Sequence, residues 1–186
     1  MRNRMSPNDH RSTSPRQVIF LDRDGTINVD RGYVFRIDDW GLGPGAIEAI
    51  RGLREAGYAI AVVTNQPGIG RGIFAESDFW ALHEHVQQQL ARQGASIDGV
   101  AFRPHSPADG FKCRKPATAI RDEIERLLGA PIDIATSWTV GDELSDAEFG
   151  RTIGTQTALI RSQYWQPAQL RERVDLVGDS LPMWPR

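Results

Sequence analysis

The stretch that decides the fold is Val18-Ile19-Phe20-Leu21-Asp22-Arg23-Asp24-Gly25-Thr26. It begins as a short apolar run, typical of a buried parallel strand, and ends in two carboxylates one residue apart, a glycine and a hydroxyl. In an open α/β sheet, ligands bind just beyond the carboxyl ends of the strands, so Asp22 and Asp24 are expected at such a place. An isolated D-x-D motif is more often a solvated loop with two surface acids, because short motifs match by chance. Its meaning therefore depends on the groups that the rest of the chain supplies.

The two carboxylates suit the hydrolysis of a phosphate ester. A carboxylate that attacks phosphorus forms an aspartyl-phosphate, which divides a difficult hydrolysis into two easier steps. It needs a divalent cation, because the carboxylate and the phosphate otherwise repel each other. It also needs a second acid that protonates the leaving alkoxide and later deprotonates the attacking water. Asp22, which is nearest to the strand end, is the predicted nucleophile, and Asp24 is the predicted acid–base.

Polar groups also follow the second predicted strand, which covers residues 58–63. Thr64, Asn65 and Gln66 come directly after it, at the edge of the sheet where Asp22 is expected. A glycine-rich turn at 67–72 follows, and its backbone N–H groups could join a phosphate cradle or could form only a flexible connector. Either way, the end of this strand is a predicted part of the site.

Charged groups appear at two later positions of the same kind. Arg114 and Lys115 precede a helix predicted over 117–128, and a cation near a helix start can meet a phosphate together with the positive end of the helix dipole. Asp142 and Asp146 follow a strand predicted over 137–140. Asp146 has a plainer interpretation as an acid that stabilises the start of a helix.

The order of the predicted elements indicates an α/β fold, a doubly wound (Rossmann-like) parallel sheet in one domain. Apolar residues recur at helical spacing over 44–57 and 77–93, and further strands are predicted over 97–102 and 155–160. We expect a disordered polar tail at 1–16, a single domain at 17–178 and a C-terminal tail at 179–186, and we expect residues 164–186 to pack across the outside of the domain.

Composition narrows the class of protein. The chain has 186 residues, 40% of them hydrophobic, which suits one domain with a sizeable core. The net charge of −2 and the pI of about 6.1 give no basic field for nucleic acid. A single cysteine, Cys113, fits a reducing compartment, and the sequence contains no run of apolar residues long enough for a membrane helix. We expect a cytoplasmic monomer that binds neither nucleic acid nor membrane.

The ordered set of motifs resembles the haloacid dehalogenase (HAD) phosphohydrolase superfamily. Asp22–Thr26 is similar to its first motif, Thr64 to its second, Lys115 to its third, and Gly141-Asp142 with Asp146 to its fourth. Forty positions separate Asp24 from Thr64 and 51 separate Thr64 from Lys115, and each interval is filled by a predicted loop, helix and strand. The resemblance therefore implies a member without a cap domain, in which the loops 28–39 and 103–115 exclude water and select the substrate.

The resemblance also implies roles for particular residues. Mg²⁺ would be bound by the side chains of Asp22 and Asp142 and by the backbone carbonyl of Asp24, an oxygen-only set that this ion favours. The phosphate would be held by Thr64 and Lys115 and by the further predicted contacts Asn65, Arg71 and Arg114. Asp146 would support the metal shell or orient Lys115.

Within the capless group, the chain is similar to the branch that contains histidinol-phosphate and heptose bisphosphate phosphatases. The segments 22–28, 31–34 and 64–72 resemble the heptose enzymes more closely, and Arg71 belongs to the Gly-Ile-x-Arg-Gly turn of that group. The resemblance thus implies removal of the 7-phosphate from a heptose bisphosphate. Histidinol phosphate and a polynucleotide 3′-phosphate are the alternative substrates, although the acidic pI argues against the second.

One departure concerns zinc. Members of this branch commonly bind a structural Zn²⁺ through a Cys-x-His and a Cys-x-Cys pair before Arg-Lys-Pro. The corresponding residues are Arg103, His105, Phe111 and Cys113, so only two ligand types are kept, whereas tetrahedral zinc needs four. We expect structural Zn²⁺ to be absent.

Two further hypotheses stay open at this stage. His105 and Cys113 could form a Cys/His nucleophile, although the complete aspartate set argues against it. A phosphate-sensing scaffold on an inactive fold would have lost a catalytic carboxylate, and none is lost. In the loop after Thr26, the apolar residues Tyr33, Val34 and Phe35 either pack the loop down or wall a substrate pocket.

Overall fold

The computed structural model describes residues 14–104, 119–170 and 174–181. Its sheet has six strands, all parallel, in the order β3-β2-β1-β4-β5-β6. The strands are β1 (Val18–Leu21), β2 (Ala59–Asn65), β3 (Gly99–Arg103), β4 (Trp138–Gly141), β5 (Gln156–Ile160) and β6 (Leu176–Gly178). The strand order reverses between β1 and β4, which makes this the doubly wound sheet predicted from the sequence.

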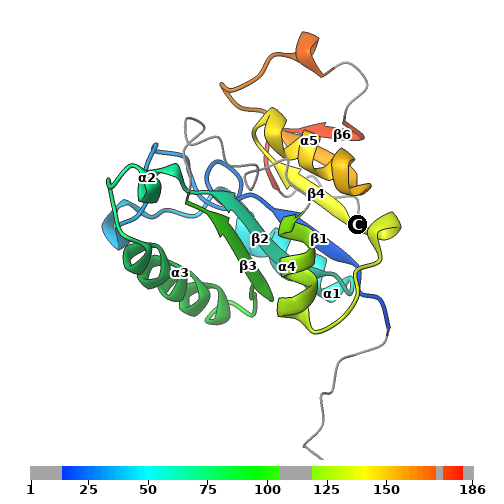
Figure 1. Cartoon of the computed structure of the whole chain (residues 1–186), viewed down its shortest axis with the longest axis horizontal. Coiled ribbons are helices and arrows are strands. Elements are labelled where there is room, and N and C mark those ends of the chain that lie inside the picture. The colour runs from blue at the N-terminus through cyan, green and yellow to red at the C-terminus, as the bar shows by residue number, and fades with distance from the viewer. Residues whose placement is uncertain (1–13, 105–118, 171–173, 182–186) are drawn as a thin grey trace, which may run out of the picture.

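Helices cover both faces of the sheet. They are α1 (Ala46–Glu55), α2 (Pro67–Gly70), α3 (Glu76–Ala91), α4 (Ala119–Leu128) and α5 (Leu144–Ile153), with the 3₁₀ helices η1 (Ile37–Asp39), η3 (Ile134–Thr136) and η4 (Pro167–Gln169). In Figure 1, α4 lies in front of the central strands and α1 behind them. No helix in the described part of the chain has the length and apolar character needed to cross a bilayer.

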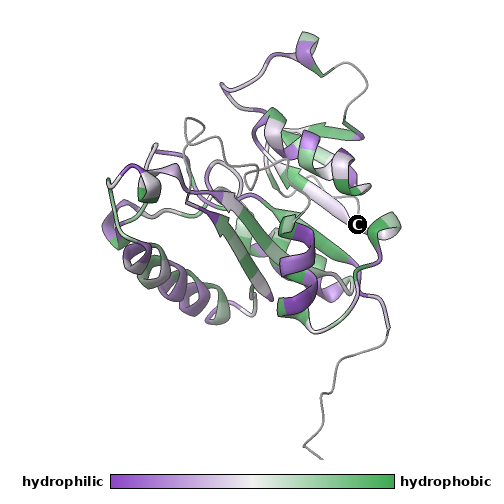
Figure 2. Ribbon diagram, viewed as in Figure 1, coloured by the Kyte–Doolittle hydropathy of each residue, from purple (hydrophilic) through white to green (hydrophobic). Residues whose placement is uncertain are grey.

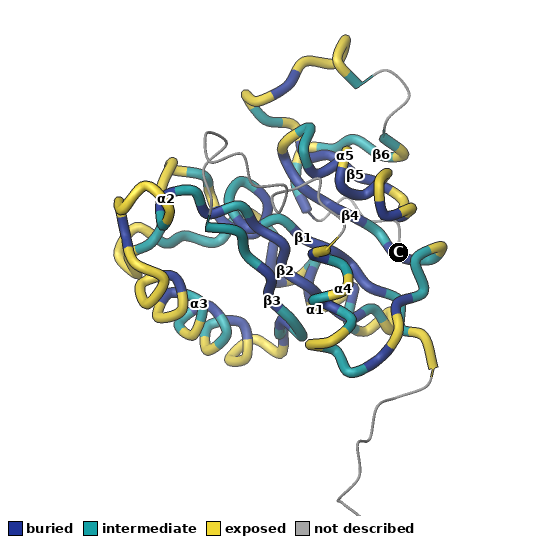
Figure 3. The backbone as a smooth tube through the Cα atoms, in the orientation of Figure 1, coloured by how far each residue is buried: buried dark blue, intermediate teal, exposed yellow. Residues whose placement is uncertain are grey.

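Alternation along β1 builds two separate cores. Ile19 and Leu21 pack with α1 and α3 on one face, whereas Val18 and Phe20 pack with α4 and α5 on the other. Successive side chains of a strand point to opposite faces, so a central strand covered on both faces must be apolar throughout. All four residues of β1 are fully buried, and Figure 3 shows the central strands as the buried layer of the molecule. This rigid strand carries Asp22 at its carboxyl end.

The outer helices are amphipathic. Phe79, Leu82, Val86 and Leu90 of α3 recur at helical spacing and are buried, whereas much of its opposite face is exposed. The same helix shows hydrophilic and hydrophobic residues on opposite sides in Figure 2. Burying these four side chains stabilises the domain by roughly 1.5–3 kcal/mol each.

The chain contains no inserted cap in the described region around the site. A loop, η1 and α1 fill the interval between β1 and β2, and α2 and α3 fill the interval between β2 and β3. The capless architecture predicted from the interval lengths is therefore confirmed for these segments. The predicted loops must supply any cover over the site.

The C-terminal segment differs from the prediction. Residues 176–178, expected to lie in a segment packed across the outside, instead form β6, which pairs in parallel with β5. Leu181 is buried in the core cluster that also contains residues of α1, α3 and the sheet. Arg16 forms a parallel bridge opposite Ile132, in which its N–H donates to the carbonyl of Pro131 and its carbonyl accepts from the N–H of Asp133, both at 2.9 Å. The sequence predicts tails at both positions. The division into tails and domain otherwise remains a prediction, because residues 1–13 and 182–186 lie outside the described chain.

Candidate active site

The site lies where the strand order reverses. Leu21 of β1 pairs with Val62 of β2 on one side and with Val140 of β4 on the other, so the residues after these three strands meet at one edge of the sheet. The backbone N–H of Asp22 donates to the carbonyl of Val140 at 2.9 Å, which ties the end of β1 to β4. Open α/β sheets bind ligands at such a switch point.

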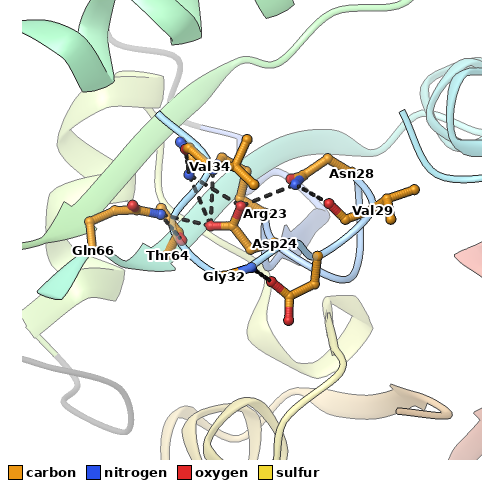
Figure 4. Close-up of polar contacts among 9 residues, drawn as sticks. Arg23, Asp24, Asn28, Val29, Gly32, Val34, Thr64 and Gln66 are labelled. Atoms are coloured by element: carbon orange, nitrogen blue, oxygen red, sulfur yellow. Dashed lines mark hydrogen bonds and ion pairs between the residues drawn. The ribbon is translucent and has the colours of Figure 1, made fainter. Parts of the chain in front are cut away.

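Asp24 is surrounded by donors (Figure 4). The Nη2 atom of Arg23 lies 2.9 Å from Oδ2 and 3.2 Å from Oδ1, Gln66 Nε2 lies 2.9 Å from Oδ2, and Asn28 Nδ2 lies 3.1 Å from Oδ1. An ionised carboxylate has about four acceptor positions, so this shell satisfies both oxygens. The predicted acid–base is therefore held in a defined orientation.

Arg23 is a buried cation that sequence patterns do not single out. Only 5% of the residue is exposed, its Nη2 also donates to the carbonyl of Val34 at 2.7 Å, and its guanidinium lies 5.4 Å from the centre of the Phe79 ring. A buried charge must be paired and hydrogen-bonded, and both conditions are met here by Asp24 and Val34. Arg23 thus connects the predicted acid–base to the loop 28–39 and to α3.

His83 of α3 lies close to Arg23. Burial, followed by the positive charge of Arg23, lowers the pKa of His83 to about 4. Its ring packs almost parallel to that of Phe79, with ring centres 6.5 Å apart. His83, Phe79 and Arg23 line a cavity of about 10 Å³, which is close to the volume of one water molecule and too small for a substrate.

Asp142 reaches the D-x-D loop from β4. It is 3% exposed, and a Cβ added to Gly25 would overlap its carboxylate, so only glycine at position 25 allows the loop to approach Asp142 this closely. Gly25 also has φ of +81°, which disfavours any residue with a side chain. The hydroxyl of Ser162 donates to the Asp142 carbonyl at 2.6 Å and fixes the backbone there. The acids after β1 and β4 are thereby brought together.

The donor set can be compared with the needs of Mg²⁺. This ion keeps several waters and is usually bound by one or two carboxylates, not by an all-protein cage. Over the described ranges, no group of three or more His, Cys, Asp or Glu side chains is arranged like a metal site. Asp22 and Asp142, with the carbonyl of Asp24, fit the ion by their chemistry and by their position at adjacent strand ends.

Asp146 caps the start of α5, in agreement with its plainer interpretation from the sequence. It is 2% exposed, and its Oδ2 accepts a hydrogen bond of 3.0 Å from the backbone N–H of Glu143 at the start of α5. It also packs on Gly141, where an added Cβ would overlap its carboxyl group. The helix-start interpretation is therefore confirmed, and its role toward a metal or Lys115 stays a prediction.

The end of β2 supplies Thr64 and Asn65. Thr64 is buried, and its Oγ1 accepts a hydrogen bond of 2.9 Å from Gln66 Nε2, while Asn65 pairs with Arg103 of β3. The predicted phosphate-binding Thr64 thus lies beside Asp24, because Gln66 contacts both. Lys115 and Arg114, the other predicted phosphate ligands, lie outside the described residues.

Of the two interpretations of the glycine-rich turn, the structure favours the connector. The turn contains the short helix α2, and the N–H groups of residues 69–73 all donate to backbone carbonyls, that of Gly70 to Pro104 at 2.9 Å. These five groups are therefore already hydrogen-bonded within the protein. Gly68 is required for packing, since an added Cβ would overlap the Phe74 ring.

The packing interpretation of the loop 28–39 is confirmed for two of its three apolar residues, and the pocket-wall interpretation stays a prediction for the third. Val34 is buried and Phe35 stacks on Phe74 with ring centres 4.9 Å apart, so these two side chains pack the loop down. Tyr33 is 38% exposed, and its hydroxyl accepts a hydrogen bond of 2.6 Å from Arg71 Nη1. Tyr33 and Arg71 therefore remain candidates for the wall of a substrate pocket.

A second contact ties this loop to the segment after β5. The hydroxyl of Tyr164 donates to the carboxylate of Asp30, and this hydrogen bond is the main cause of a raised pKa of Tyr164. The other oxygen of Asp30 accepts from the backbone N–H of Gly32 at 2.8 Å. The loop is thus anchored at both its apolar centre and its polar start.

Comparisons with known proteins identify the family. A family model described as HAD-hydrolase-like matches residues 112–183. The D-glycero-β-D-manno-heptose-1,7-bisphosphate 7-phosphatase of Yersinia pestis is 40% identical over 178 residues, covering 91% of this chain and 93% of its own length. The enzyme of the same name from Escherichia coli K12 is 39% identical over 178 residues, with 91% and 92% covered.

Solved structures give the same result. A D,D-heptose 1,7-bisphosphate phosphatase from B. bronchiseptica, crystallised with magnesium and phosphate, has a TM-score of 0.75 at 31% identity and covers 89% of this chain and 93% of its own. The corresponding enzyme from Burkholderia thailandensis has a TM-score of 0.60 at 30% identity, with 89% and 94% covered. The fold and the site define a HAD-like phosphatase. Within that class, the chain belongs to the family of these heptose bisphosphate phosphatases.

Proposed function

We propose that the protein removes the 7-phosphate from D-glycero-β-D-manno-heptose 1,7-bisphosphate with the help of Mg²⁺. The observation that carries the proposal is the meeting of Asp24, Thr64 and Asp142 at the carboxyl end of β1, in a chain about 40% identical to enzymes of that name. The magnesium and phosphate in the B. bronchiseptica structure support the same cofactor and reaction.

The reaction divides into two steps on this chain's own residues. In the first, an oxygen of Asp22 forms a bond to phosphorus, the bond from phosphorus to the sugar oxygen breaks, and Asp24 gives its proton to that oxygen. In the second, Asp24 takes a proton from water, the water oxygen bonds to phosphorus, and Asp22 is released with inorganic phosphate. Thr64 and Asn65 hold phosphoryl oxygens, as do Lys115 and Arg114 in the proposal.

Mg²⁺, held by Asp22, Asp142 and the carbonyl of Asp24, supplies positive charge that reduces the repulsion between two anions. Arg71, beside Tyr33 at the protein surface, suits the part of the substrate that does not react, because its guanidinium can pair with a phosphate. The sugar hydroxyls and this second phosphate distinguish the heptose substrate from histidinol phosphate.

Turnover of three substrates tests the proposal. With Mg²⁺ present, the heptose bisphosphate should be hydrolysed faster than histidinol phosphate and faster than a 3′-phosphorylated oligonucleotide. The Asp22→Asn variant should fold normally and lose turnover on all three substrates, because an amide does not attack phosphorus. Near-normal turnover in this variant would contradict the aspartyl-phosphate mechanism, and a preference for either alternative substrate would contradict the substrate assignment.

Some expectations from the sequence remain predictions. A monomer in the cytoplasm that binds neither nucleic acid nor membrane is consistent with the pI of about 6.1. Light scattering coupled to gel filtration would measure the oligomeric state. A mass of two or more chains would contradict the monomer.

A further inference from the structure

Gln66 joins two groups of the proposed reaction. Its Nε2 lies 2.9 Å from Asp24 Oδ2 and 2.9 Å from Thr64 Oγ1, and Figure 4 shows the amide between them. Only 4% of the residue is exposed. We propose that Gln66 is a positioning residue, which aims the acid–base Asp24 at the leaving oxygen and leaves the Thr64 hydroxyl free to donate to the phosphate. The inference rests on the phosphatase function proposed above.

The chemistry of the two partners determines how the amide is turned. Oδ2 of Asp24 also accepts a hydrogen bond from Arg23 and so acts as an acceptor, which means that the NH₂ group of Gln66, and not its carbonyl oxygen, faces Asp24. This group has two hydrogens, one for Asp24 and one for Thr64. Because Thr64 Oγ1 accepts from Gln66, its own hydrogen is available for another acceptor. A phosphoryl oxygen, which only accepts, is the acceptor that the reaction brings there.

The backbone of Gln66 is fixed on both sides. Its N–H donates to the carbonyl of Arg103 at 2.7 Å, and its own carbonyl accepts from Ile69 at 3.2 Å. The side chain therefore starts from a defined place between β2 and α2. Buried polar side chains that are fully hydrogen-bonded specify one arrangement of their partners.

Gln66 gives Asp24 an orientation that Arg23 alone does not. Arg23 contacts Oδ2 through Nη2 at 2.9 Å and Nε at 3.2 Å and contacts Oδ1 through Nη2 at 3.2 Å, but none of these contacts links Asp24 to Thr64. Gln66 bonds to Oδ2, and Asn28 bonds to Oδ1. Removal of the amide takes away the donor that fixes the position of Oδ2 relative to the Thr64 hydroxyl.

Two leaving groups distinguish positioning of the acid from a general structural role. A sugar alkoxide must be protonated as it leaves, whereas p-nitrophenolate is a stable anion and leaves without a proton. In the Gln66→Met variant, kcat/KM for the heptose bisphosphate should fall about 10- to 100-fold, since a misplaced acid loses much of its effect. For p-nitrophenyl phosphate it should fall less than about threefold. An equal loss on both substrates would overturn the proposal.

Gln87→Met is the matched control. Gln87 of α3 also holds two partners with its amide, the backbone carbonyl and N–H of Ile97 at 2.9 and 3.1 Å. This variant should melt at a lower temperature and leave the ratio of the two kcat/KM values as in the wild type. A changed ratio in the control would show that the loss of any amide with two hydrogen-bond partners changes the ratio, and would overturn the proposal.

Gln66→Glu supplies a second, independent readout. The introduced carboxyl group can donate to Asp24 only when it is protonated, so activity on the sugar phosphate should recover, relative to wild type, as the pH is lowered. An unchanged pH profile would overturn the proposal, even if Gln66→Met does not fold. Wild-type protein that hydrolyses neither ester would instead overturn the phosphatase function itself, so the two failures are distinguishable.

Discussion

At the scale of the residue, Gly25 shows how a missing side chain builds a site. The D-x-D loop and Asp142 approach so closely that a methyl group would overlap the carboxylate, and the positive φ of Gly25 is a second reason for glycine. These two effects have different consequences. Backbone strain lowers stability, whereas displacement of Asp142 alters the proposed metal ligands.

The Gly25→Ala variant should therefore lose activity as well as stability. Forcing alanine into positive φ costs about 1–2 kcal/mol, and moving Asp142 should lower kcat/KM on the order of 10²-fold and raise the Mg²⁺ concentration needed for half-maximal rate. Thermal melting and Mg²⁺ titrations of turnover measure the two effects. Gly57→Ala is the control, because Gly57 has φ of +95° and open space around the added Cβ. It should lose stability and keep activity, and loss of activity there would show that strain alone is responsible.

At the scale of the element, Arg23 lies between the end of β1, which it follows in the chain, and α3, whose Phe79 ring it contacts. The four apolar residues of β1 predicted the strand, because a central strand that is buried on both faces consists of apolar residues throughout. The position of the strand in turn predicted that the carboxylates after it lie at the edge of the sheet. The contacts of Asp24 with Gln66 were not predictable, since the two residues are 42 positions apart and only the folded sheet brings them together. A polar residue directly after a buried strand was the available signal for Gln66.

Other elements were missed for local reasons. β6 has three residues of intermediate burial at the edge of the sheet, too few for a periodic pattern, and its pairing depends on β5. The sequence left the turn 67–72 open as a phosphate cradle or a connector, because only the fold shows that the N–H groups of residues 69–73 are bonded to carbonyls of the segment and of Pro104. The long buried strands and amphipathic helices were predictable, and the short segments at the rim of the site were not.

His83 on α3 gives the fold a defined acid sensitivity. Its pKa is about 4 in the folded protein and 6.5 in the unfolded chain, so between these values the unfolded state binds more protons. The free energy of unfolding should thus fall as the pH is lowered from about 6.5 to 4, by on the order of 2–3 kcal/mol from this group.

Denaturant titrations of wild type and His83→Gln between pH 4 and 8 would measure this contribution. The variant should show a shallower loss of stability on acidification, because its amide does not titrate. At pH 8 histidine is neutral in both states, so the difference there gives the packing cost of the substitution alone. Equal slopes for the two proteins would contradict the assignment to His83.

At the scale of the whole molecule, the site depends on the stacking of two cores on one sheet. The residues proposed to act lie at the ends of β1, β2 and β4, which are the strands at the centre of the sheet, and both faces of these strands are covered. The outer elements are more exposed in Figure 3. A rigid centre with a variable rim allows one chemistry to serve different substrates.

The predicted absence of structural zinc concerns the whole molecule, because without zinc other groups must attach the loop after β3 to the domain. Arg103, at the place of one expected ligand, lies 2.7 Å from Glu123 of α4 in an ion pair, and its carbonyl accepts from Gln66. The start of the loop is therefore attached to the domain by protein groups. His105, Phe111 and Cys113 lie outside the described residues.

Metal analysis and melting test that prediction directly. Protein purified without added zinc should contain much less than one Zn²⁺ per chain, and a zinc-selective chelator should change neither the melting temperature nor the turnover with Mg²⁺. Cys113→Ser should also melt like the wild type, because a single thiolate contributes no tetrahedral site. Glu123→Gln, which weakens the Arg103 ion pair, should lower the melting temperature measurably. One tightly bound Zn²⁺ per chain, or a large loss of stability in Cys113→Ser, would show that this loop keeps a metal through other ligands.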